Sequence, residues 1–227
     1  MSKNTLILVD LQNDFMPGGA LAVTKGDEVV PVANRLITSC KFDLIVATQD
    51  HHPPSHKSFA SSHKDKKIGD IIDLNGVQQF LWPDHCVWGT DGAAFHKNLL
   101  IGRVNLILRK GTNPEIDSYS GLYDNNKGKT GLIGYLDDNK AGALYIVGLA
   151  TDYCVKYTAM DAVQSGFDTY LIEDGCRAVN ITPTDGQEAI EAMRKIGVHI
   201  TNEKNSLAMI DNMKAHPGGV IKANEKP

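Results

Sequence analysis

Short apolar runs recur along this chain and alternate with longer segments in which apolar residues are spaced by three or four positions. The runs are almost uninterrupted, as in TLILV at residues 5–9. Such runs are typical of strands covered on both faces of a parallel sheet. On this pattern, strands are predicted at residues 5–9, 42–48, 104–108, 143–147, 168–172 and 198–201.

Several of the segments between these strands have the pattern of amphipathic helices. Valine, alanine, leucine and isoleucine recur at helical spacing in residues 27–40. Further helices are predicted at residues 152–164 and 184–196, the second ending at Gly197. This alternation predicts an open, mostly parallel sheet with helices on both faces, and a ligand site at the carboxyl ends of its strands.

Two long segments carry no clear periodic pattern. Residues 55–81 are polar, and neither a helix nor a strand is predicted in them. Residues 111–129 are rich in glycine and asparagine and too long for an ordinary connection, so a functional loop near a pocket is expected there. The tail from residue 217 is expected to be mobile, and residues 1–227 to form a single domain.

Composition narrows the class of protein. The 227 residues are 42% hydrophobic and carry a formal net charge of -4, which argues against a dedicated nucleic-acid binder. Four cysteines without CxxC spacing, in a chain without an apolar signal segment, favour a reducing compartment. No apolar run approaches membrane-spanning length. We therefore expect a cytoplasmic protein that binds neither membranes nor nucleic acids.

Three polar residues with complementary chemistry each follow an apolar strand. They are Asp10, Lys110 and Cys154, and a parallel sheet brings such strand ends to one edge. Cys154 falls in the first turn of a predicted helix, where the helix dipole favours a thiolate. A carboxylate could accept its proton, and an ammonium could hold that carboxylate charged. Taken singly, each residue has a structural explanation: a buried inert cysteine, a capping aspartate and a solvent-facing lysine.

A second polar group is expected near the same edge. Asp50 and His52 stand two positions apart, and His85 lies in the motif WPDHC. One carboxylate and two imidazoles leave coordination positions open on a divalent ion such as zinc, iron or manganese. The alternative is that Asp50 and His52 cap a loop. His56 is close enough in sequence to be a fourth ligand or to support one.

Several separated motifs together resemble one known family, the nicotinamidases of the isochorismatase-like cysteine hydrolases, often called pyrazinamidases. The motifs are LILVDLQNDF with PGGAL, DHHP, FLWPDHCV, RKGTNPEIDSYSGLYDN and GLATDYCVKYTAMDA followed by EDGCRAVN. The resemblance implies a three-layer α/β/α fold around a mostly parallel six-stranded sheet. It also implies hydrolysis of nicotinamide to nicotinate and ammonia in NAD salvage, with pyrazinamide as a further substrate.

The resemblance carries roles over to particular residues. It implies a catalytic triad of Asp10, Lys110 and Cys154. It implies one divalent metal ion, with zinc preferred over iron or manganese, bound by Asp50, His52 and His85. The substrate ring would lie against Phe15, Trp82 and Tyr119. A cis peptide bond before Ala150 would turn its N–H toward the nucleophile, so that the N–H groups of Ala150 and Cys154 form an oxyanion hole.

Three other functions remain open on the sequence. The first is a sister amidase such as an isochorismatase or a ureido-amide hydrolase, against which the metal ligands and WPDHC argue. The second is a redox sensor with Cys154 as a peroxide-reactive thiol. The third is a non-catalytic metal-binding domain. The sequence also leaves the oligomeric state open, with a homo-oligomer as one alternative, and it names no protein partner.

Overall fold

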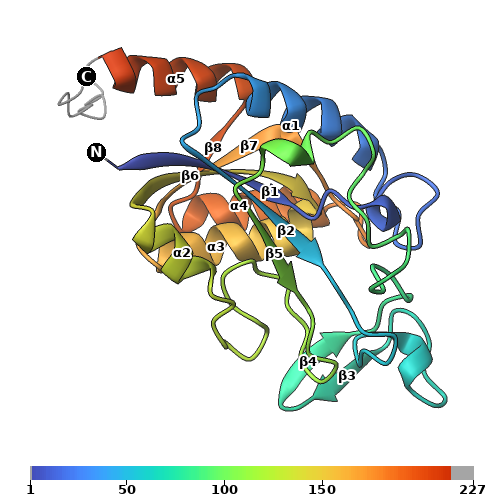
Figure 1. The fold of residues 1–227 in the computed structure, drawn as a ribbon. Helices are drawn as coiled ribbons and strands as arrows, with labels where there is room; N and C mark the ends of the chain where they lie inside the picture. The colour runs from blue at the N-terminus through green and yellow to red at the C-terminus, as the bar shows by residue number, and fades with distance from the viewer. Residues whose placement is uncertain (1, 216–227) are drawn as a thin grey trace.

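The computed structural model describes residues 2–215 as a sheet of six strands between two layers of helices (Figure 1). The sheet has the order β5-β2-β1-β6-β7-β8, and every neighbouring pair is parallel. Its strands are β1 (Lys3–Val9), β2 (Leu44–Asp50), β5 (Leu106–Lys110), β6 (Ala141–Leu149), β7 (Asp168–Arg177) and β8 (His199–Thr201). The predicted three-layer fold is therefore confirmed.

Residues 2–215 form five α-helices and several shorter helical turns, most of which connect strands. The α-helices are α1 (Val29–Thr38), α2 (Leu132–Asp138), α3 (Lys156–Gln164), α4 (Asp185–Lys195) and α5 (Glu203–Ala215). The turns are η1 (Asn13–Phe15), η2 (Gly26–Glu28), η3 (Ala60–Ser62), η4 (Ile101–Arg103) and η5 (Thr151–Val155). No helix in residues 2–215 is both long and apolar enough to cross a bilayer.

The two faces of the sheet have separate apolar cores. α1 and α5 cover one face, where Leu36 and Ile210 pack with Leu8 of β1. α2, α3 and α4 cover the other, where Leu136 and Met193 belong to the second cluster. Each strand in the middle of the sheet is therefore buried on both sides, which explains why its sequence is almost uninterruptedly apolar.

Successive strands are added to the sheet first on one side of β1 and then on its other side. From β1 the chain builds outward to β2 and β5, and it then returns to place β6 on the other side of β1. The carboxyl ends of β1 and β6 thus flank the switch point at which open α/β sheets bind ligands. Gly148 allows the two strands to approach closely there, because a Cβ at this position would lie 2.1 Å from the Val9 carbonyl oxygen.

The segments that lacked a periodic pattern contain structure that was not predicted. β3 (Ile71–Leu74) and β4 (Val77–Phe80) form an antiparallel hairpin that projects away from the main sheet (Figure 1). The helices α2 and α5 were also not predicted. The predicted mobile tail from residue 217 lies outside the described residues.

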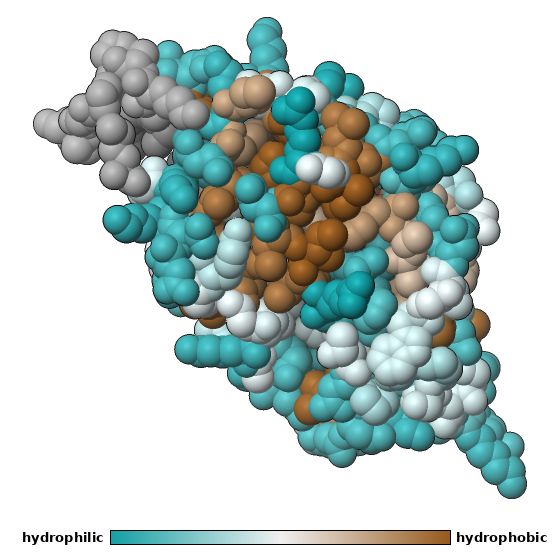
Figure 2. Space-filling view, in the orientation of Figure 1, coloured by the Kyte–Doolittle hydropathy of each residue, from teal (hydrophilic) through white to brown (hydrophobic). Residues whose placement is uncertain are grey.

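The edge strand β5 leaves part of its apolar surface open. Figure 2 shows apolar side chains gathered in the middle of the face that carries this strand. Ile107 of β5 is 44% exposed, whereas Leu8 of the central strand β1 is fully buried.

This difference in burial predicts that shortening the two side chains lowers the free energy of unfolding by different amounts. Leu8→Ala should lower the free energy of unfolding by about 2–5 kcal/mol, because it leaves a cavity in a double-sided core. Ile107→Ala is the control on the exposed edge and should change it by about 1 kcal/mol or less. Urea denaturation of both variants measures the difference, and equal losses would contradict this account of the core.

Candidate active site

The three residues predicted to share a strand edge lie close together, with Lys110 in contact with both of the others. Asp10 directly follows β1, Lys110 is the last residue of β5, and Cys154 lies in η5 after β6. The Lys110 ammonium lies 2.9 Å from Asp10 Oδ2 and 3.3 Å from Cys154 Sγ. All three side chains are buried. Their strands arrive from both sides of the switch point, so the sheet topology alone brings them together.

Hydrogen bonds hold the lysine and the aspartate in place. Thr48 Oγ1 donates to Asp10 Oδ1 over 2.6 Å, which leaves Oδ2 to face the ammonium. Lys110 also donates to the Ser118 carbonyl at 2.9 Å and to Asp50 Oδ1 at 2.5 Å. The ammonium is therefore fixed by two carboxylates and a carbonyl, and its remaining neighbour is the thiol.

Burial and charge set the protonation of these groups. Burial raises the pKa of Asp10 to about 6, although the positive charge of Lys110 opposes it. For Lys110, burial alone would lower the pKa, but Asp10 and Asp50 together raise it well above its usual value. The lysine is therefore a permanent cation, and Asp10 is the group of this cluster that changes charge near neutral pH.

The expectation of a thiolate at Cys154 is wrong for the protein without a bound ligand. Burial raises the pKa of the Cys154 thiol well above its ordinary value, and the nearby Lys110 charge offsets this only in part. That charge is already neutralised by two carboxylates. The predicted helix over residues 152–164 also differs, because residues Thr151–Val155 form a π-helical turn and α3 begins at Lys156. Cys154 is therefore a neutral thiol that needs a base.

The predicted metal ligands form a compact cluster beside the lysine. Asp50 ends β2, and its Oδ2 lies 3.7 Å from His52 Nε2 and 4.0 Å from His85 Nε2. Although burial would raise the pKa of Asp50, Lys110 and the imidazoles lower it well below the usual range. Asp50 thus presents one oxygen to Lys110 and the other to the two histidines.

The donor set of this cluster fits a divalent ion. His52 Nδ1 lies 2.9 Å from the Gly111 carbonyl, and His85 Nδ1 lies 2.8 Å from the Pro83 carbonyl. A carbonyl only accepts, so each Nδ1 carries the hydrogen and each Nε2 keeps its lone pair. Backbone carbonyls behind the imidazoles are the usual support of metal-ligating histidines. Donor atoms of the three residues all lie within 4.8 Å of one another, and three protein ligands are typical of an open catalytic site.

His56 lies against this cluster but is oriented differently. It is fully buried, and its ring centroid is 4.4 Å from that of His52. Its Nδ1 accepts the backbone N–H of Ser58 at 3.2 Å. Burial lowers the pKa of His56 to about 4, so the ring is neutral with its hydrogen on Nε2. In this tautomer, His56 can donate a hydrogen from Nε2.

A narrow pocket opens onto both groups. The predicted residues Phe15, Trp82, Tyr119 and Ala150 line it together with Cys154, Asp50, His52 and His85. The peptide bond between Leu149 and Ala150 is cis, as the resemblance implied. Phe15 and Trp82 are almost fully buried, so their rings form walls of the pocket and not part of the outer surface.

The projecting hairpin supports one wall of this pocket. Gln79 of β4 donates to Asp117 Oδ2 at 3.0 Å and to the Tyr119 hydroxyl at 3.2 Å. Trp82, just beyond β4, donates its Nε1–H to the same hydroxyl at 3.0 Å. Two residues of the loop expected near a pocket, Asp117 and Tyr119, therefore line it on a support supplied by the hairpin.

Four pocket residues were not identified in the sequence: Leu21, Asp117, Tyr153 and Val179. Asp152, two residues before Cys154, was missed as well. Its carboxylate accepts the backbone N–H groups of Val179 at 3.0 Å and of Asn180 at 2.8 Å. It thereby ties the turn that carries Cys154 to the segment that forms the pocket wall. The position of Asp152 before Cys154 was the only available signal.

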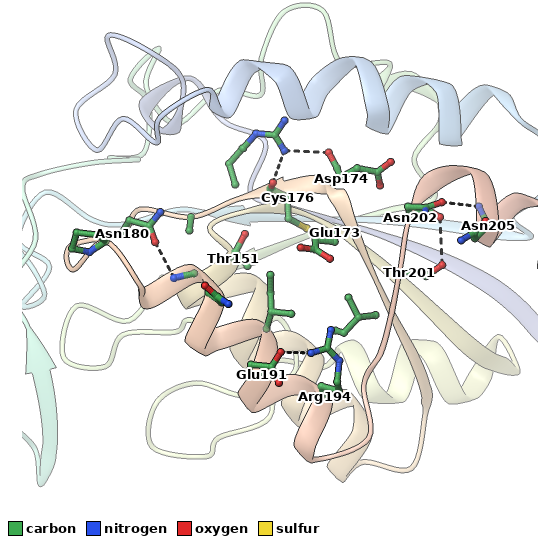
Figure 3. A pocket seen from close by; sticks show the side chains of 17 residues that line it. Thr151, Glu173, Asp174, Cys176, Asn180, Glu191, Arg194, Thr201, Asn202 and Asn205 are labelled. Atoms are coloured by element: carbon green, nitrogen blue, oxygen red, sulfur yellow. Dashed lines mark hydrogen bonds and ion pairs between the residues drawn. The ribbon is translucent and has the colours of Figure 1, made fainter. Parts of the chain in front are cut away.

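A wider groove of about 1020 Å³ lies beside β7, β8 and α4 (Figure 3). It contains none of the predicted site residues. Its arginines are already engaged, Arg177 with the carbonyls of Asp174 and Cys176, and Arg194 with Glu191. The groove therefore lacks the side chains on which the predicted chemistry depends, and these lie at the narrow pocket.

Comparison with known proteins agrees with this geometry. Residues 4–204 match the family model of the isochorismatase domain. The nicotinamidase of Escherichia coli is 46% identical over 200 residues, which are 87% of this chain and 93% of that protein. A nicotinamidase and pyrazinamidase structure from Acinetobacter baumanii superposes with a TM-score of 0.87 at 40% identity, covering 91% and 99% of the two chains. A pyrazinamidase of Pyrococcus horikoshii in complex with zinc gives a TM-score of 0.69 at 37% identity, covering 88% and 98%.

The contact between His52 and Gly111 predicts that the metal affinity can be lowered without substituting a predicted ligand. In Gly111→Ala, the new Cβ would lie 2.3 Å from His52 Cε1. The imidazole must then shift from its carbonyl partner, and the affinity for Zn²⁺ should fall by about 10- to 100-fold.

Competition with a chromogenic chelator measures this affinity. Gly131→Ala is the matched control, because Gly131 also has a positive φ, of 97°, but no atom within 4 Å of an added Cβ. Equal Zn²⁺ affinity in the two variants would show that the contact between Gly111 and His52 does not position the ligand.

Proposed function

This chain belongs to the isochorismatase family, and we propose that it hydrolyses nicotinamide to nicotinate and ammonia, and pyrazinamide in the same way. The observation that carries the proposal is the Cys154 thiol, which lies 3.3 Å from an ammonium that is itself paired with Asp10. This group opens into a pocket with aromatic walls, as a flat heteroaromatic amide requires. Residues 1–227 would act as one hydrolase domain that returns nicotinamide to NAD synthesis.

The substrate ring is held between Phe15 and Trp82, with Tyr119 at the same wall. Aromatic side chains bind a pyridine ring by offset or edge-to-face contacts and exclude water from it. The carboxamide then points toward Cys154 at the inner end of the pocket. Holding the amide carbon beside the thiol converts a bimolecular attack into an intramolecular one.

In the first half-reaction, Asp10 removes the proton of the Cys154 thiol, and the sulfur attacks the amide carbon. The raised pKa of the buried thiol makes this base necessary, and the Lys110 charge stabilises the thiolate as it forms. The N–H groups of Ala150 and Cys154 stabilise the oxyanion, a contribution that is typically worth about 2.7–4 kcal/mol per donor. Asp10 then gives its proton to the leaving ammonia, and a thioester remains.

In the second half-reaction, water attacks the thioester and nicotinate leaves. The carbon–sulfur bond breaks with its electron pair on sulfur, and Cys154 recovers a proton. The chain then holds the thiol and the Asp10 carboxylate with which it began.

Asp50, His52 and His85 would hold a divalent ion at the edge of the pocket. We propose zinc, with iron or manganese as alternatives, because two imidazoles and one carboxylate suit all three. When bound, such an ion supplies Lewis-acid chemistry and a fixed contact for the pyridine nitrogen. The neighbouring Lys110 keeps Asp50 ionised for this role.

The burial of Cys154 argues against the alternative of a redox sensor. Sensor thiols are exposed and have a low pKa, because the thiolate is the form that reacts with peroxide. Cys154 is 6% exposed, and its pKa is raised. The contact of the thiol with Lys110, which is itself paired with Asp10, likewise favours a catalytic protein over a non-catalytic metal-binding domain.

The nucleophile is tested by Cys154→Ala. This variant should lose turnover of nicotinamide by about 10⁴-fold or more, because no covalent path remains. It should still bind nicotinamide, since the walls of the pocket are unchanged. Ammonia and nicotinate are followed together, and binding is measured by calorimetry. Cys40→Ser, at an exposed cysteine outside the pocket, is the control and should remain active. Wild-type turnover in Cys154→Ala would end the proposal.

The role of Asp10 predicts an acid limit of activity. A base must be ionised to accept a proton, so kcat/KM should fall about tenfold for each pH unit below the Asp10 pKa of about 6. Above this pH, the carboxylate is fully ionised and the profile should be flat until another group titrates. Asp10→Asn should be nearly inactive at every pH. A profile that is level from pH 5 to pH 7 would contradict the assignment of Asp10 as the base.

A further inference from the structure

Two buried polar side chains have no role in the reaction as described above: Asp117, which lines the pocket, and His56, which packs against His52 behind it. His56 is fully buried, and Asp117 is 4% exposed. Asp117 lines the same pocket as Cys154. Donor atoms of His52, His56 and Asp117 lie within 4.8 Å of one another, so His56 and Asp117 adjoin the predicted metal cluster through the shared residue His52.

His56 presents a buried N–H group for which the described part of the chain supplies no acceptor. Its Nδ1 is held by Ser58, whose backbone N–H donates to it at 3.2 Å and whose hydroxyl lies at 2.7 Å. The hydrogen of the ring is therefore on Nε2. His56 Nε2 is buried and has no hydrogen-bond partner within residues 2–215. A buried donor in this state costs free energy unless the site supplies it with an acceptor, such as a water molecule.

Asp117 offers the complementary acceptor. Its Oδ1 receives the backbone N–H of Ser118 at 2.7 Å, and its Oδ2 receives Gln79 Nε2 at 3.0 Å. A carboxylate has about four acceptor positions, so each oxygen can take a further hydrogen. The contact with Gln79 of the hairpin and the contact with the neighbouring Ser118 fix the carboxylate and leave its other acceptor positions to the pocket.

We infer that His56 and Asp117 bind the water molecule that hydrolyses the acyl-enzyme, with His56 Nε2–H as donor to its oxygen and Asp117 as acceptor of its proton. The inference rests on the proposed function, because it concerns the second half of that reaction. The site needs one donor and one acceptor to fix a water by both its lone pair and its hydrogen, and this pair supplies one of each.

Hydrolysis of the thioester begins with attack by the bound water. The water oxygen bonds to the thioester carbon while one of its protons moves to Asp117. The carbon–sulfur bond then breaks, and its electron pair stays on Cys154. The nascent carboxylic acid returns its remaining proton to this thiolate, and Asp117 releases its proton to solvent. Nicotinate, the free thiol and an ionised Asp117 result.

This assignment divides the work between two carboxylates. Asp10 is held against Lys110 and Thr48 on the side of the thiol. Asp117 is held by Gln79 on the side of the hairpin. Loss of Asp117 should therefore slow the release of nicotinate while leaving the release of the first equivalent of ammonia.

The test separates the two half-reactions in Asp117→Asn. We expect a burst of one equivalent of ammonia per enzyme, followed by a steady-state rate that is lower by about 10²- to 10⁴-fold. KM should fall together with kcat, and intact-protein mass spectrometry should show nicotinoylated enzyme. Hydroxylamine, which attacks thioesters without a base, should restore turnover in part. Asp161→Asn, at a buried aspartate of α3 outside the pocket, is the control and should show no burst.

A pair of variants at His56 tests the donor independently. His56→Asn keeps an oxygen where Nδ1 accepts the Ser58 N–H but removes the Nε2 donor. His56→Gln places an amide N–H near the position of Nε2. If His56 only fills space, the two variants should behave alike. We expect His56→Asn to accumulate the acyl-enzyme and His56→Gln to release nicotinate faster.

Two results would overturn the inference. One is an equal slowing of ammonia and nicotinate release in Asp117→Asn without acyl-enzyme, which would make Asp117 a structural residue. The other is loss of bound metal from the His56 variants by elemental analysis, which would make His56 a ligand. Failure of the proposed function is distinguishable, because the wild-type enzyme would then release no ammonia from nicotinamide, and the inference would fall with it.

Discussion

The Lys110 ammonium is the interaction on which the site depends. It lies between two buried carboxylates, Asp10 and Asp50, and within 3.3 Å of the Cys154 thiol. Without it, two like charges would share a dry space, and at least one would have to bind a proton. Breaking a buried ion pair by removing one partner typically costs about 3–5 kcal/mol. The same cation therefore keeps Asp50 ionised for a metal and Asp10 available for the thiol.

The sheet explains how one lysine reaches both groups. β2 and β5 are neighbours, and their register places Asp50 directly beside Lys110. β1 lies on the other side of β2, so Asp10 is the next strand end along the edge. Cys154 arrives from beyond the switch point. Asp10, Asp50, Lys110 and Cys154, to which catalytic or metal-binding roles are assigned by proposal, thus follow one another along one edge of the sheet, and their separation is set by the spacing of strands.

Much of this arrangement could be predicted from the sequence, because buried parallel strands have a strong apolar pattern and their ends are marked by a polar residue. Asp10, Lys110 and Cys154 could be brought together on that ground alone. The protonation state of Cys154 could not be predicted, because its pKa depends on burial. A strand–turn–helix pattern does not reveal how deeply the thiol is buried. Asp117 was missed because it lies in a loop, and the β3–β4 hairpin because short exposed strands alternate too weakly to be recognised.

Different parts of the fold supply the far wall of the pocket and its reacting groups, and the hairpin supports the wall. Gln79 and Trp82 hold Tyr119 and Asp117 from a segment that stands apart from the main sheet, whereas Asp10, Lys110 and Cys154 belong to the sheet edge. Changes in the hairpin can therefore remodel the far wall while the reacting groups stay in register. In evolutionary terms, the fold carries an exchangeable module: descendants of such an enzyme can acquire new amides by varying residues 71–82 without rebuilding the catalytic machinery.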